Sequence, residues 1–229
     1  MNSKKPISIL LSEDQQIVRE GLRVMLDLEP DFEVVAEAQD GRQAVALAIR
    51  HEPAVVLMDI AMPQLNGLEA TRQICRALPG TRVIMLSAHS SEEHVGRATE
   101  AGAAGFLLKH EVSIHDVYRA IREVEKGRTH FSPLISRRID RLRSQSPGNA
   151  TASAGKRCEL TLRQSEVLQC VAESRANKQI ADDLGIDIKT VEKHRKNLME
   201  KLNIHDTAGL TRYAISAGVI ECDVSLSVV

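Results

Sequence analysis

The stretch Ala54-Val55-Val56-Leu57-Met58-Asp59 decides the fold, because it is a short run of apolar residues that ends in a carboxylate. A run of this length, rich in β-branched side chains, is typical of a strand buried on both faces of a parallel sheet. Similar apolar runs occupy residues 7–11, 32–36, 82–86 and 105–108. Three of these runs also lead into polar side chains, namely Glu13 with Asp14, Ser87, and Lys109.

Between the apolar runs, apolar residues recur with the spacing of a helix. In the first such segment, Val18, Leu22 and Met25 are three or four residues apart, as on one helix face. Helices are predicted at residues 15–28, 41–51, 66–77, 91–101 and 113–126. Five strand–helix units in succession predict an α/β domain with a doubly wound, five-stranded parallel sheet of the flavodoxin-like type.

The polar residues that follow the strands are expected to share one edge of this sheet. Carboxyl ends of parallel strands meet at a single edge, and ligands bind in the crevice outside it. Three carboxylates there, from Glu13, Asp14 and Asp59, suit Mg²⁺ or Mn²⁺. One carboxylate can then attack a phosphoryl donor, while Ser87 and Lys109 bind phosphoryl oxygens. Any one of the five, taken alone, is more often an ordinary loop residue or helix cap, but five together at one edge favour a functional site.

Composition limits the remaining possibilities. A chain of 229 residues is long enough for about two domains, and with no Trp, three Phe and two Tyr the cores must be aliphatic. The four cysteines, at 75, 158, 170 and 222, are far apart and form no Cys-x-x-Cys pair, so reduced thiols are expected. No apolar stretch approaches the roughly 20 residues of a membrane span. The apolar run near the N-terminus is too short for a signal peptide, so we expect a soluble cytoplasmic protein without a membrane partner.

The alternation of strand and helix patterns ends near residue 128, where the composition of the sequence changes. Ser132-Pro133 could cap a short helix that carries four arginines, and residues 144–155 are nearly all small or polar. Residues 1–128 are therefore predicted to form the first domain, and residues 129–158 a linker with that short helix.

Residues 159–221 are predicted to form an all-α domain of four helices, followed by a tail at 222–229. Thr161-x-x-Gln164 is a capping-box signature that opens the first helix. The second helix, at about 178–184, stops at Gly185, and Asp187 can cap the third, which runs to about residue 202. The fourth helix follows residue 206 and ends near residue 218. The tight connection between the second and third helices matches a helix-turn-helix.

The third of these helices carries a polar stripe that could enter the major groove of DNA. The stripe consists of Lys189, Glu192, Lys193 and Lys196, spaced for one helix face and suited to base edges. Phosphate contacts are expected from Lys178, Thr190, His194, Arg195 and Lys201, although His194 borders the apolar face and could simply pack. Residues 156–229 carry eleven Lys and Arg against eleven Asp and Glu, so an ordinary solvated face remains the alternative.

Several motifs make a family resemblance explicit. Residues 5–128 resemble the receiver domain of two-component response regulators through Ser12-Glu13-Asp14, Leu57-Met58-Asp59-Ile60-x-Met62-Pro63-x-x-Asn66-Gly67, Met85-Leu86-Ser87-Ala88 and Gly102-Ala103-x-Gly105-Phe106-Leu107-Leu108-Lys109. The resemblance implies that Asp59 accepts phosphate from a sensor histidine kinase and that the acidic pair binds Mg²⁺. It also implies that the Ala61 backbone carbonyl is a further metal ligand, and that Ser87 and Lys109 recognise the phosphoryl group.

Two positions depart from the common receiver pattern. Glu13 stands where Asp is common, and this longer side chain can hold the metal through water. Phe106 stands where a Tyr is often found in receiver domains. The resemblance implies that the aromatic ring at this position rotates inward when the hydroxyl at the position of Ser87 moves. We expect the couple of Ser87 and Phe106 to act as the switch between conformational states.

The second domain resembles the LuxR-type helix-turn-helix over about residues 159–221. The resemblance rests on Leu160-Thr161-x-Arg163-x-x-Glu166-Val167-Leu168, Asn177-Lys178-x-Ile180-Ala181-x-x-Leu184, Lys189-Thr190-Val191-Glu192-x-His194-Arg195 and Met199-x-Lys201-Leu202. The whole architecture is similar to the NarL/FixJ family of response regulators, whose members bind DNA as dimers through the last helix. Leu210 and Tyr213 give that helix an apolar face for a homodimer, which could equally be core within the domain.

The expected function is therefore a transcription regulator that dimerises and binds promoter DNA after Mg²⁺-dependent phosphorylation of Asp59. Its chemistry would be limited to self-phosphorylation and autodephosphorylation, and it would not be an enzyme. A phosphatase of the haloacid dehalogenase type is disfavoured, because Ala61 stands where that class has a second Asp. The alternative kept open is a regulator of the same architecture that acts independently of phosphorylation.

Overall fold

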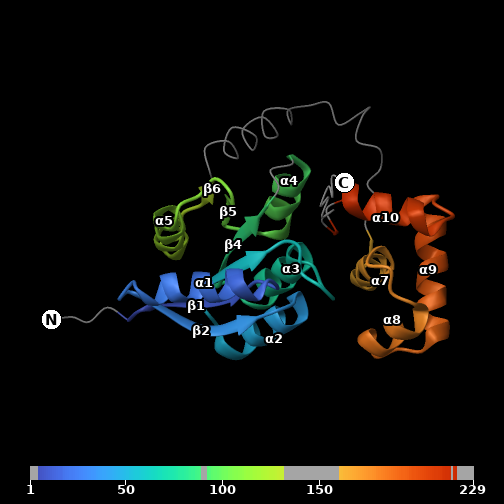
Figure 1. Ribbon diagram of the computed structural model, residues 1–229, viewed down its shortest axis with the longest axis horizontal. Coiled ribbons are helices and arrows are strands. Elements are labelled where there is room, and N and C mark those ends of the chain that lie inside the picture. Colours follow the sequence, from blue (N-terminus) through green and yellow to red (C-terminus); the bar gives the residue numbers. More distant parts are fainter. Residues whose placement is uncertain (1–4, 89–91, 132–159, 218, 221–229) are drawn as a thin grey trace, which may run out of the picture. The chain divides into compact units, whose positions relative to one another are not determined.

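The computed structural model describes residues 5–88, 92–131, 160–217 and 219–220, and the chain divides into two compact units, residues 1–151 and 152–229 (Figure 1). The predicted short helix after Ser132-Pro133, most of the predicted linker and the tail at 222–229 lie outside the described residues.

The first unit is a parallel sheet with helices on both faces. Its strands follow the order β2-β1-β3-β4-β5-β6, so the chain reverses direction across the sheet between β1 and β3. The elements are β1 (Ile7–Ser12), α1 (Gln16–Asp27), β2 (Phe32–Ala38), α2 (Gly41–His51), β3 (Val55–Asp59), α3 (Gly67–Ala77), β4 (Arg82–Ser87), α4 (Glu92–Ala101), β5 (Gly105–Leu108), α5 (Ile114–Glu125) and β6 (His130–Phe131). The α/β class with a doubly wound sheet is confirmed.

The sheet has six strands where the sequence predicted five. The sixth, β6, pairs in parallel with β5 through Gly105 with His130 and Phe106 with Phe131. These two residues fall at the start of the predicted linker, so the sheet extends beyond residue 128. A strand of two residues has no alternating pattern, and its pairing depends only on the edge that β5 offers.

Alternate residues of each central strand supply two separate cores. One face buries Leu10, Val56 and Met85 against α2, α3 and α4. The other buries Leu11 and Leu57 against α1 and α5. This alternation explains why the strands are apolar throughout, since neither face of the sheet meets water.

Glycine and helix caps fix the loop that follows β3. The Asn66 side chain accepts a hydrogen bond from the Glu69 N–H at 2.9 Å and so caps α3. A Cβ on Gly67, the first residue of α3, would lie 1.9 Å from the Asp59 carbonyl oxygen. Only glycine allows α3 to begin this close to the end of β3.

The second unit contains α7 (Leu162–Ala172), α8 (Asn177–Leu184), α9 (Ile188–Leu202) and α10 (Thr207–Ser216), packed around an aliphatic core. The capping box of Thr161 and Gln164 is present, and Gly185 ends α8 with a φ of 61°. Asp187 occupies the N-cap position of α9 as predicted, although its side chain accepts no capping hydrogen bond. Main-chain hydrogen bonds from Thr190 and Val191 to the Asp187 carbonyl start the helix instead.

Two further expectations concern the chain as a whole. Cys75 and Cys170 are free thiols, while Cys158 and Cys222 lie outside the described residues. Within the described part of the chain, every helix is too short or too polar to cross a membrane.

Candidate functional site

The carboxyl edge of the sheet brings the predicted acidic residues and Lys109 together. The Lys109 ammonium lies 2.8 Å from a Glu13 carboxylate oxygen and 2.9 Å from an Asp59 carboxylate oxygen. Glu13 and Asp59 are buried, whereas Asp14 is exposed. One carboxylate oxygen from each of Glu13, Asp14 and Asp59 lies within 4.8 Å of the other two. Four of the five residues expected at this edge therefore form a cluster of three carboxylates and one ammonium group.

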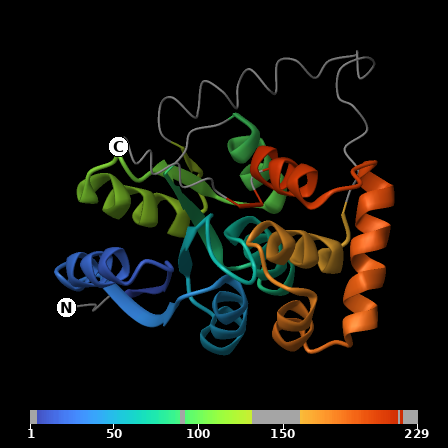
Figure 2. The same cartoon turned by 45° about the vertical axis from the view of Figure 1, so that its right-hand side comes forward.

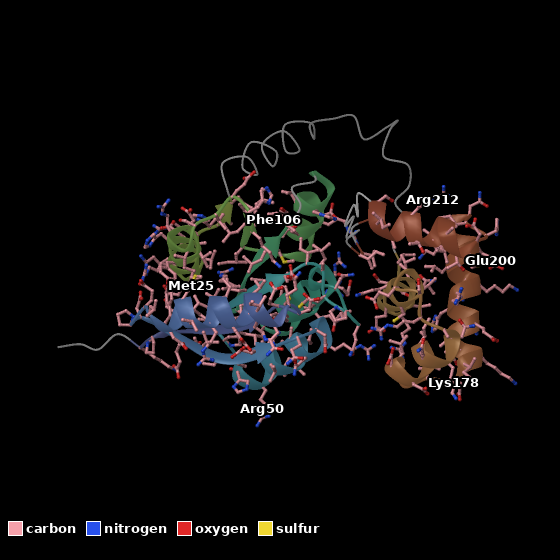
Figure 3. All side chains as sticks on the ribbon, viewed as in Figure 1. Met25, Arg50, Phe106, Lys178, Glu200 and Arg212 are labelled. Carbon is pink, nitrogen blue, oxygen red and sulfur yellow. The ribbon has the colours of Figure 1, made fainter. Side chains whose placement is uncertain are left out.

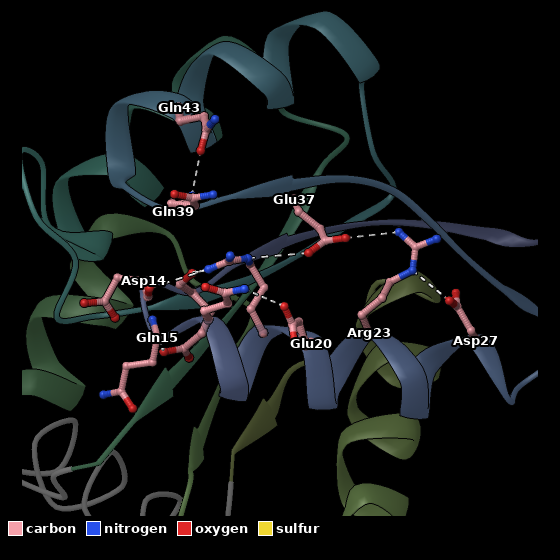
Figure 4. Close-up of polar contacts among 11 residues, drawn as sticks. Asp14, Gln15, Glu20, Arg23, Asp27, Glu37, Gln39 and Gln43 are labelled. Atoms are coloured by element: carbon pink, nitrogen blue, oxygen red, sulfur yellow. Dashed lines mark hydrogen bonds and ion pairs between the residues drawn. The ribbon is translucent and has the colours of Figure 1, made fainter.

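Arg19, which the sequence analysis did not single out, holds the acidic pair in place. Its guanidinium donates to the Glu13 carbonyl at 2.8 Å and lies 3.5 Å from the Glu37 carboxylate of β2. A second guanidinium contact of Arg19 reaches the Asp14 carbonyl at 3.5 Å, and Figure 4 shows Glu37 paired with residues of α1. Arg19 is only 7% exposed, and an arginine beside the apolar positions of an otherwise amphipathic helix was the one signal that could have revealed it.

Main-chain contacts fix the other members of the site. The Asp59 carboxylate accepts a hydrogen bond from the Ile60 N–H at 2.9 Å. The Lys109 N–H donates to the carbonyl of Ser87 at 2.8 Å, which ties the ends of β5 and β4 together. Ser87 is fully buried at the end of β4, and Ala61 lies half-buried in the loop after β3. The Ser87 hydroxyl at the end of β4 and the Ala61 carbonyl in the loop after β3 therefore lie at the same edge of the sheet.

The surroundings of the cluster change its proton affinities. Burial, together with the negative charge of Asp59, raises the pKa of Glu13 to about 7. Burial also raises the pKa of Asp59, although Lys109 opposes this shift. Burial alone would lower the pKa of Lys109, but the Asp59 and Glu13 carboxylates raise it. The ammonium therefore stays charged and compensates for carboxylates that burial makes costly.

The chemistry of this donor set fits a small divalent cation. Carboxylate oxygens from two buried residues and one exposed residue can bind a hard cation while water completes its coordination. A divalent charge would also offset the mutual repulsion that keeps the pKa of Glu13 high.

Phe106 lies in the core that faces α2, α3 and α4, and its side chain is fully buried (Figure 3). It pairs in register with Met85 of β4, whose sulfur lies 3.1 Å from the Thr71 hydroxyl oxygen. Val95 and Ala98 of α4 belong to the same core. The predicted switch residue is therefore packed inward, against the helix that follows the strand ending in Ser87.

The predicted base-reading stripe lies on the open face of α9. Lys189, Glu192, Lys193 and Lys196 are all exposed, while Val191 and Leu198 on the opposite face are fully buried. Figure 2 shows α9 as a long straight helix beside α7, α8 and α10. An ion pair of 3.8 Å joins Lys196 to Glu200 within the stripe. A helix held by its apolar face and free along its cationic face can be inserted into a groove.

The residues predicted to contact phosphates fall into three groups. Lys178 is exposed on α8 (Figure 3), and Lys201 is exposed near the end of α9. Arg195 instead donates to the Asn177 side-chain oxygen at 2.7 Å and to the Thr207 hydroxyl at 3.3 Å. It therefore braces α9 against α8 and α10. Thr190 and His194 are half-buried along the edges of the stripe.

The predicted dimer face on α10 needs correction at Leu210. This side chain is fully buried in the core of the helical unit, where α10 packs on α7. It is therefore intradomain core, which is the alternative that the sequence left open. Tyr213 is half-buried at the border of the same core and lines a surface pocket of about 560 Å³ with Ile204, Gly209 and Arg212.

The two units define a class of protein: a phosphoacceptor-type α/β domain joined to a helix-turn-helix domain. Residues 9–122 match the family model for the response regulator receiver domain, and residues 159–214 match the model for bacterial regulatory proteins of the luxR family.

Relatives with both domains show which family this is. The chain is 34% identical to the transcriptional regulatory protein DegU of Brevibacillus brevis, with 96% of this chain and 97% of DegU covered. It is 38% identical to the transcriptional regulatory protein LiaR of Bacillus subtilis, with 91% of this chain and 96% of LiaR covered. The chain therefore belongs to the NarL/FixJ family of response regulators, and it is a DNA-binding transcription regulator of a two-component system.

Solved structures agree with this assignment. A LuxR-family response regulator from Aurantimonas is 34% identical and has a TM-score of 0.57, over 61% of this chain and 99% of that one. RcsB from Salmonella enterica, bound to the promoter rprA with the phosphomimetic BeF3-, is 22% identical with a TM-score of 0.56. It covers 91% of this chain and 98% of RcsB, and at that identity it shows the fold alone.

Proposed function

We propose that Asp59 accepts a phosphoryl group from a sensor histidine kinase and that this event controls promoter binding. Mg²⁺ or Mn²⁺ would be held by Glu13, Asp14, Asp59 and the Ala61 backbone carbonyl. The observation that carries the proposal is the position of Lys109, 2.8 Å from Glu13 and 2.9 Å from Asp59. A cation that already contacts the acceptor carboxylate is placed to contact the phosphoryl oxygens bonded to it.

Each residue of the site has a distinct task in the proposed transfer. The Asp59 carboxylate is the nucleophile, and Lys109 keeps part of its charge neutralised inside a buried site. A divalent cation held by the three carboxylates would neutralise part of the charge of the acceptor and of the incoming phosphoryl group. Lys109 and the Ser87 hydroxyl then bind phosphoryl oxygens. The only chemistry we assign to the protein is this transfer, in which the phosphodonor loses its phosphoryl group to Asp59, and the later hydrolysis of the aspartyl phosphate to a free carboxylate and inorganic phosphate.

We propose that Ser87 and Phe106 transmit the change. Ser87 ends β4, and Phe106 pairs with Met85 on the same strand while packing in the core that contains Val95. A movement of the Ser87 hydroxyl toward the phosphoryl group would open space along β4 for the ring. Because the core is close-packed, a shift of the ring requires α4 to move with it.

The output is proposed to be binding of promoter DNA by a homodimer. Lys189, Glu192, Lys193 and Lys196 would read bases, while Lys178, Thr190, His194, Arg195 and Lys201 would contact phosphates. Tyr213 remains a candidate for contact between copies. A regulator of promoters works in the cytoplasm, and we propose residues 159–221 as the autonomous DNA-binding domain and residues 129–158, apart from β6, as the linker.

The test is the response of the full chain to acetyl phosphate with Mg²⁺. Wild-type protein should gain one phosphoryl group and bind promoter DNA more tightly, and Asp59→Asn should do neither. Asp182→Asn is the matched control, because this exposed carboxylate lies on α8, outside the acidic cluster. Equal promoter binding by wild-type protein with and without the phosphodonor would instead support the phosphorylation-independent alternative.

A further inference from the structure

Arg163 and Glu166 belong to the motif that opens the helical domain, and neither has a task in the proposed function. Arg163 lies in the first turn of α7, and its guanidinium donates two hydrogen bonds of 2.7 Å. One is accepted by the Glu166 carboxylate, and the other crosses to α8, where the Leu184 carbonyl accepts it. Because Glu166 is buried, it fixes the direction in which the planar guanidinium points.

Leu184 is the last residue of α8 and directly precedes the turn of the helix-turn-helix. The last carbonyls of a helix have no partner within that helix, so side chains or water must satisfy them. A guanidinium also brings the positive charge that the C-terminal end of a helix dipole favours. The contact with Arg163 therefore ties the end of α8 to α7 at the point where the chain turns toward α9.

The start of α9 depends on this turn for its position. The turn contains only residues 185–187, and the Asp187 side chain accepts no capping hydrogen bond. Ile188, the first residue of α9, is 44% exposed, and Lys189 is exposed as well. The first fully buried side chain of the helix is Val191. The turn, rather than the core, therefore sets where Lys189 lies.

We propose that Arg163 is a positioning residue for DNA recognition, which holds the turn so that Lys189 meets the base edges. This inference rests on the proposed function, in which Lys189 reads bases from α9. A hydrogen bond to a base requires a donor–acceptor distance of about 3 Å, whereas attraction to phosphates extends over a Debye length. Loss of the Arg163 contact should therefore reduce affinity for a specific site far more than affinity for unrelated DNA.

The experiment measures DNA binding by the full chain with Mg²⁺ and beryllofluoride at one salt concentration. The specific probe is a duplex that the wild-type chain selects from a random pool, and the non-specific probe is poly(dI-dC). Arg163→Met keeps the length of the side chain and removes all of its donors. The variant should bind the selected duplex about tenfold more weakly, as expected for one lost base contact, and poly(dI-dC) less than about twofold more weakly.

Two further variants separate positioning from loss of charge and from misfolding. Arg175→Met removes the same charge from the same unit, but the ion pairs of Arg175 with Glu173 and Asp183 join side chains only. Its preference for the selected duplex should stay at the wild-type level. Glu166→Gln keeps an acceptor for Arg163 and weakens its hold, so the preference should fall by less than in Arg163→Met. All binding is measured well below the melting temperature of each variant.

A double-mutant cycle tests whether Arg163 acts through Lys189. In a chain that already carries Lys189→Ala, the added change Arg163→Met should cost little further affinity for the selected duplex. Hydrogen exchange without DNA gives an independent readout. The Thr190 and Val191 N–H groups donate to the Asp187 carbonyl, and they should exchange faster in Arg163→Met.

Four results would overturn the inference. Equal losses of affinity for both probes, with a weaker salt dependence, would make Arg163 a phosphate contact. An unchanged preference in Arg163→Met would leave its contacts with a role in folding alone. Additive losses in the cycle would show that Arg163 does not act through Lys189. These three outcomes leave the proposed function intact, whereas wild-type affinity in Lys189→Ala would refute the proposed base contact itself.

Discussion

Glu13 is a buried carboxylate that lies next to both a second carboxylate and an ammonium. Burial and the Asp59 charge raise its pKa from 4.5 to about 7, in spite of the Lys109 contact. In the folded protein Glu13 therefore keeps a proton at pH values where the unfolded chain has lost it. Above about pH 7 the ionised Glu13 carboxylate lowers the stability of the metal-free protein, and its charge can then bind a divalent cation.

The first prediction is that the metal-free protein loses stability as the pH rises from about 4.5 to 7. The folded state binds more protons than the unfolded state in this window, so the free energy of unfolding falls with pH, by on the order of 2 kcal/mol. The raised pKa of Asp59 acts in the same direction, and that of Lys109 has its effect only above 10.5. Urea unfolding in EDTA at several pH values measures the slope.

Glu13→Gln is the control for this slope, since it keeps the shape of the side chain and removes the titration. The variant should show a shallower dependence over the same range, because only the raised pKa of Asp59 still contributes to the slope. Added Mg²⁺ should stabilise wild-type protein more at pH 8 than at pH 5, because the cation binds the ionised carboxylates. A wild-type protein whose stability rises from pH 4.5 to 7 in EDTA would contradict this account of Glu13.

At the scale of elements, the junction of β3 and α3 depends on one glycine. A Cβ at Gly67 would lie 1.9 Å from the backbone oxygen of Asp59, and a backbone atom cannot move aside as a flexible side chain can. We predict that Gly67→Ala lowers the free energy of unfolding by about 3 kcal/mol. Gly21→Ala, in the open middle of α1, should raise it by about 0.5–1 kcal/mol through helix propensity. Thermal unfolding compares both variants with wild type.

The recognition helix allows a test that separates DNA contact from packing. Lys193 is exposed on α9, whereas Arg195 joins α9 to Asn177 and Thr207. We predict that Lys193→Ala weakens promoter binding with no change in melting temperature, and that it reduces the salt dependence of binding if it contacts phosphate. Arg195→Ala should lower the melting temperature of the helical domain as well. A melting temperature unchanged by Arg195→Ala would show that its contacts do not brace the helix.

Elements with a strong local signal were the ones that the sequence could predict. The bounds of α2 and β5 agree to the residue, because an Asp40 cap and a compact apolar run mark them. β6 has only two residues, so no periodicity exists to detect. Leu210 shows the opposite limit: an amphipathic helix reveals which face is apolar, but only the packed structure shows whether α7 or another chain covers it.

The candidate site was predictable to the extent that it follows from strand ends. Glu13, Asp59 and Lys109 each come directly after or at the end of a buried strand, so topology alone brings them together. Arg19 could not be found this way, because its role depends on a side chain that reaches back from α1 to the Glu13 carbonyl. The contacts of Arg195 with Asn177 and Thr207 could not be found this way either, since the reach of a long side chain is not a property of helix spacing. Its phosphate contact stays a prediction.

At the scale of the whole molecule, the two units have separate aliphatic cores. Among the described residues, no core contains side chains from both units. The sheet edge that carries the acidic site belongs wholly to the first unit. Ligands of that site should therefore stabilise only the first unit directly.

We accordingly predict two transitions in calorimetry of the full chain. Mg²⁺ with beryllofluoride should raise the melting temperature of the receiver transition, and promoter DNA should raise that of the helical domain. Asp59→Asn should abolish the beryllofluoride shift and keep the shift due to DNA. A single transition that both ligands move together would show that the two units unfold as one.

The contacts of Arg122 also have a consequence for synthesis of the chain. This residue of α5 pairs with Glu29 and Asp31, and its guanidinium lies 4.8 Å from the centre of the Phe32 ring. The partners leave the ribosome early, but Arg122 emerges only when most of the first unit has been translated. The face of the sheet between α1 and α5 therefore stays open until α5 arrives, and the receiver completes its fold while the helical domain is still being made.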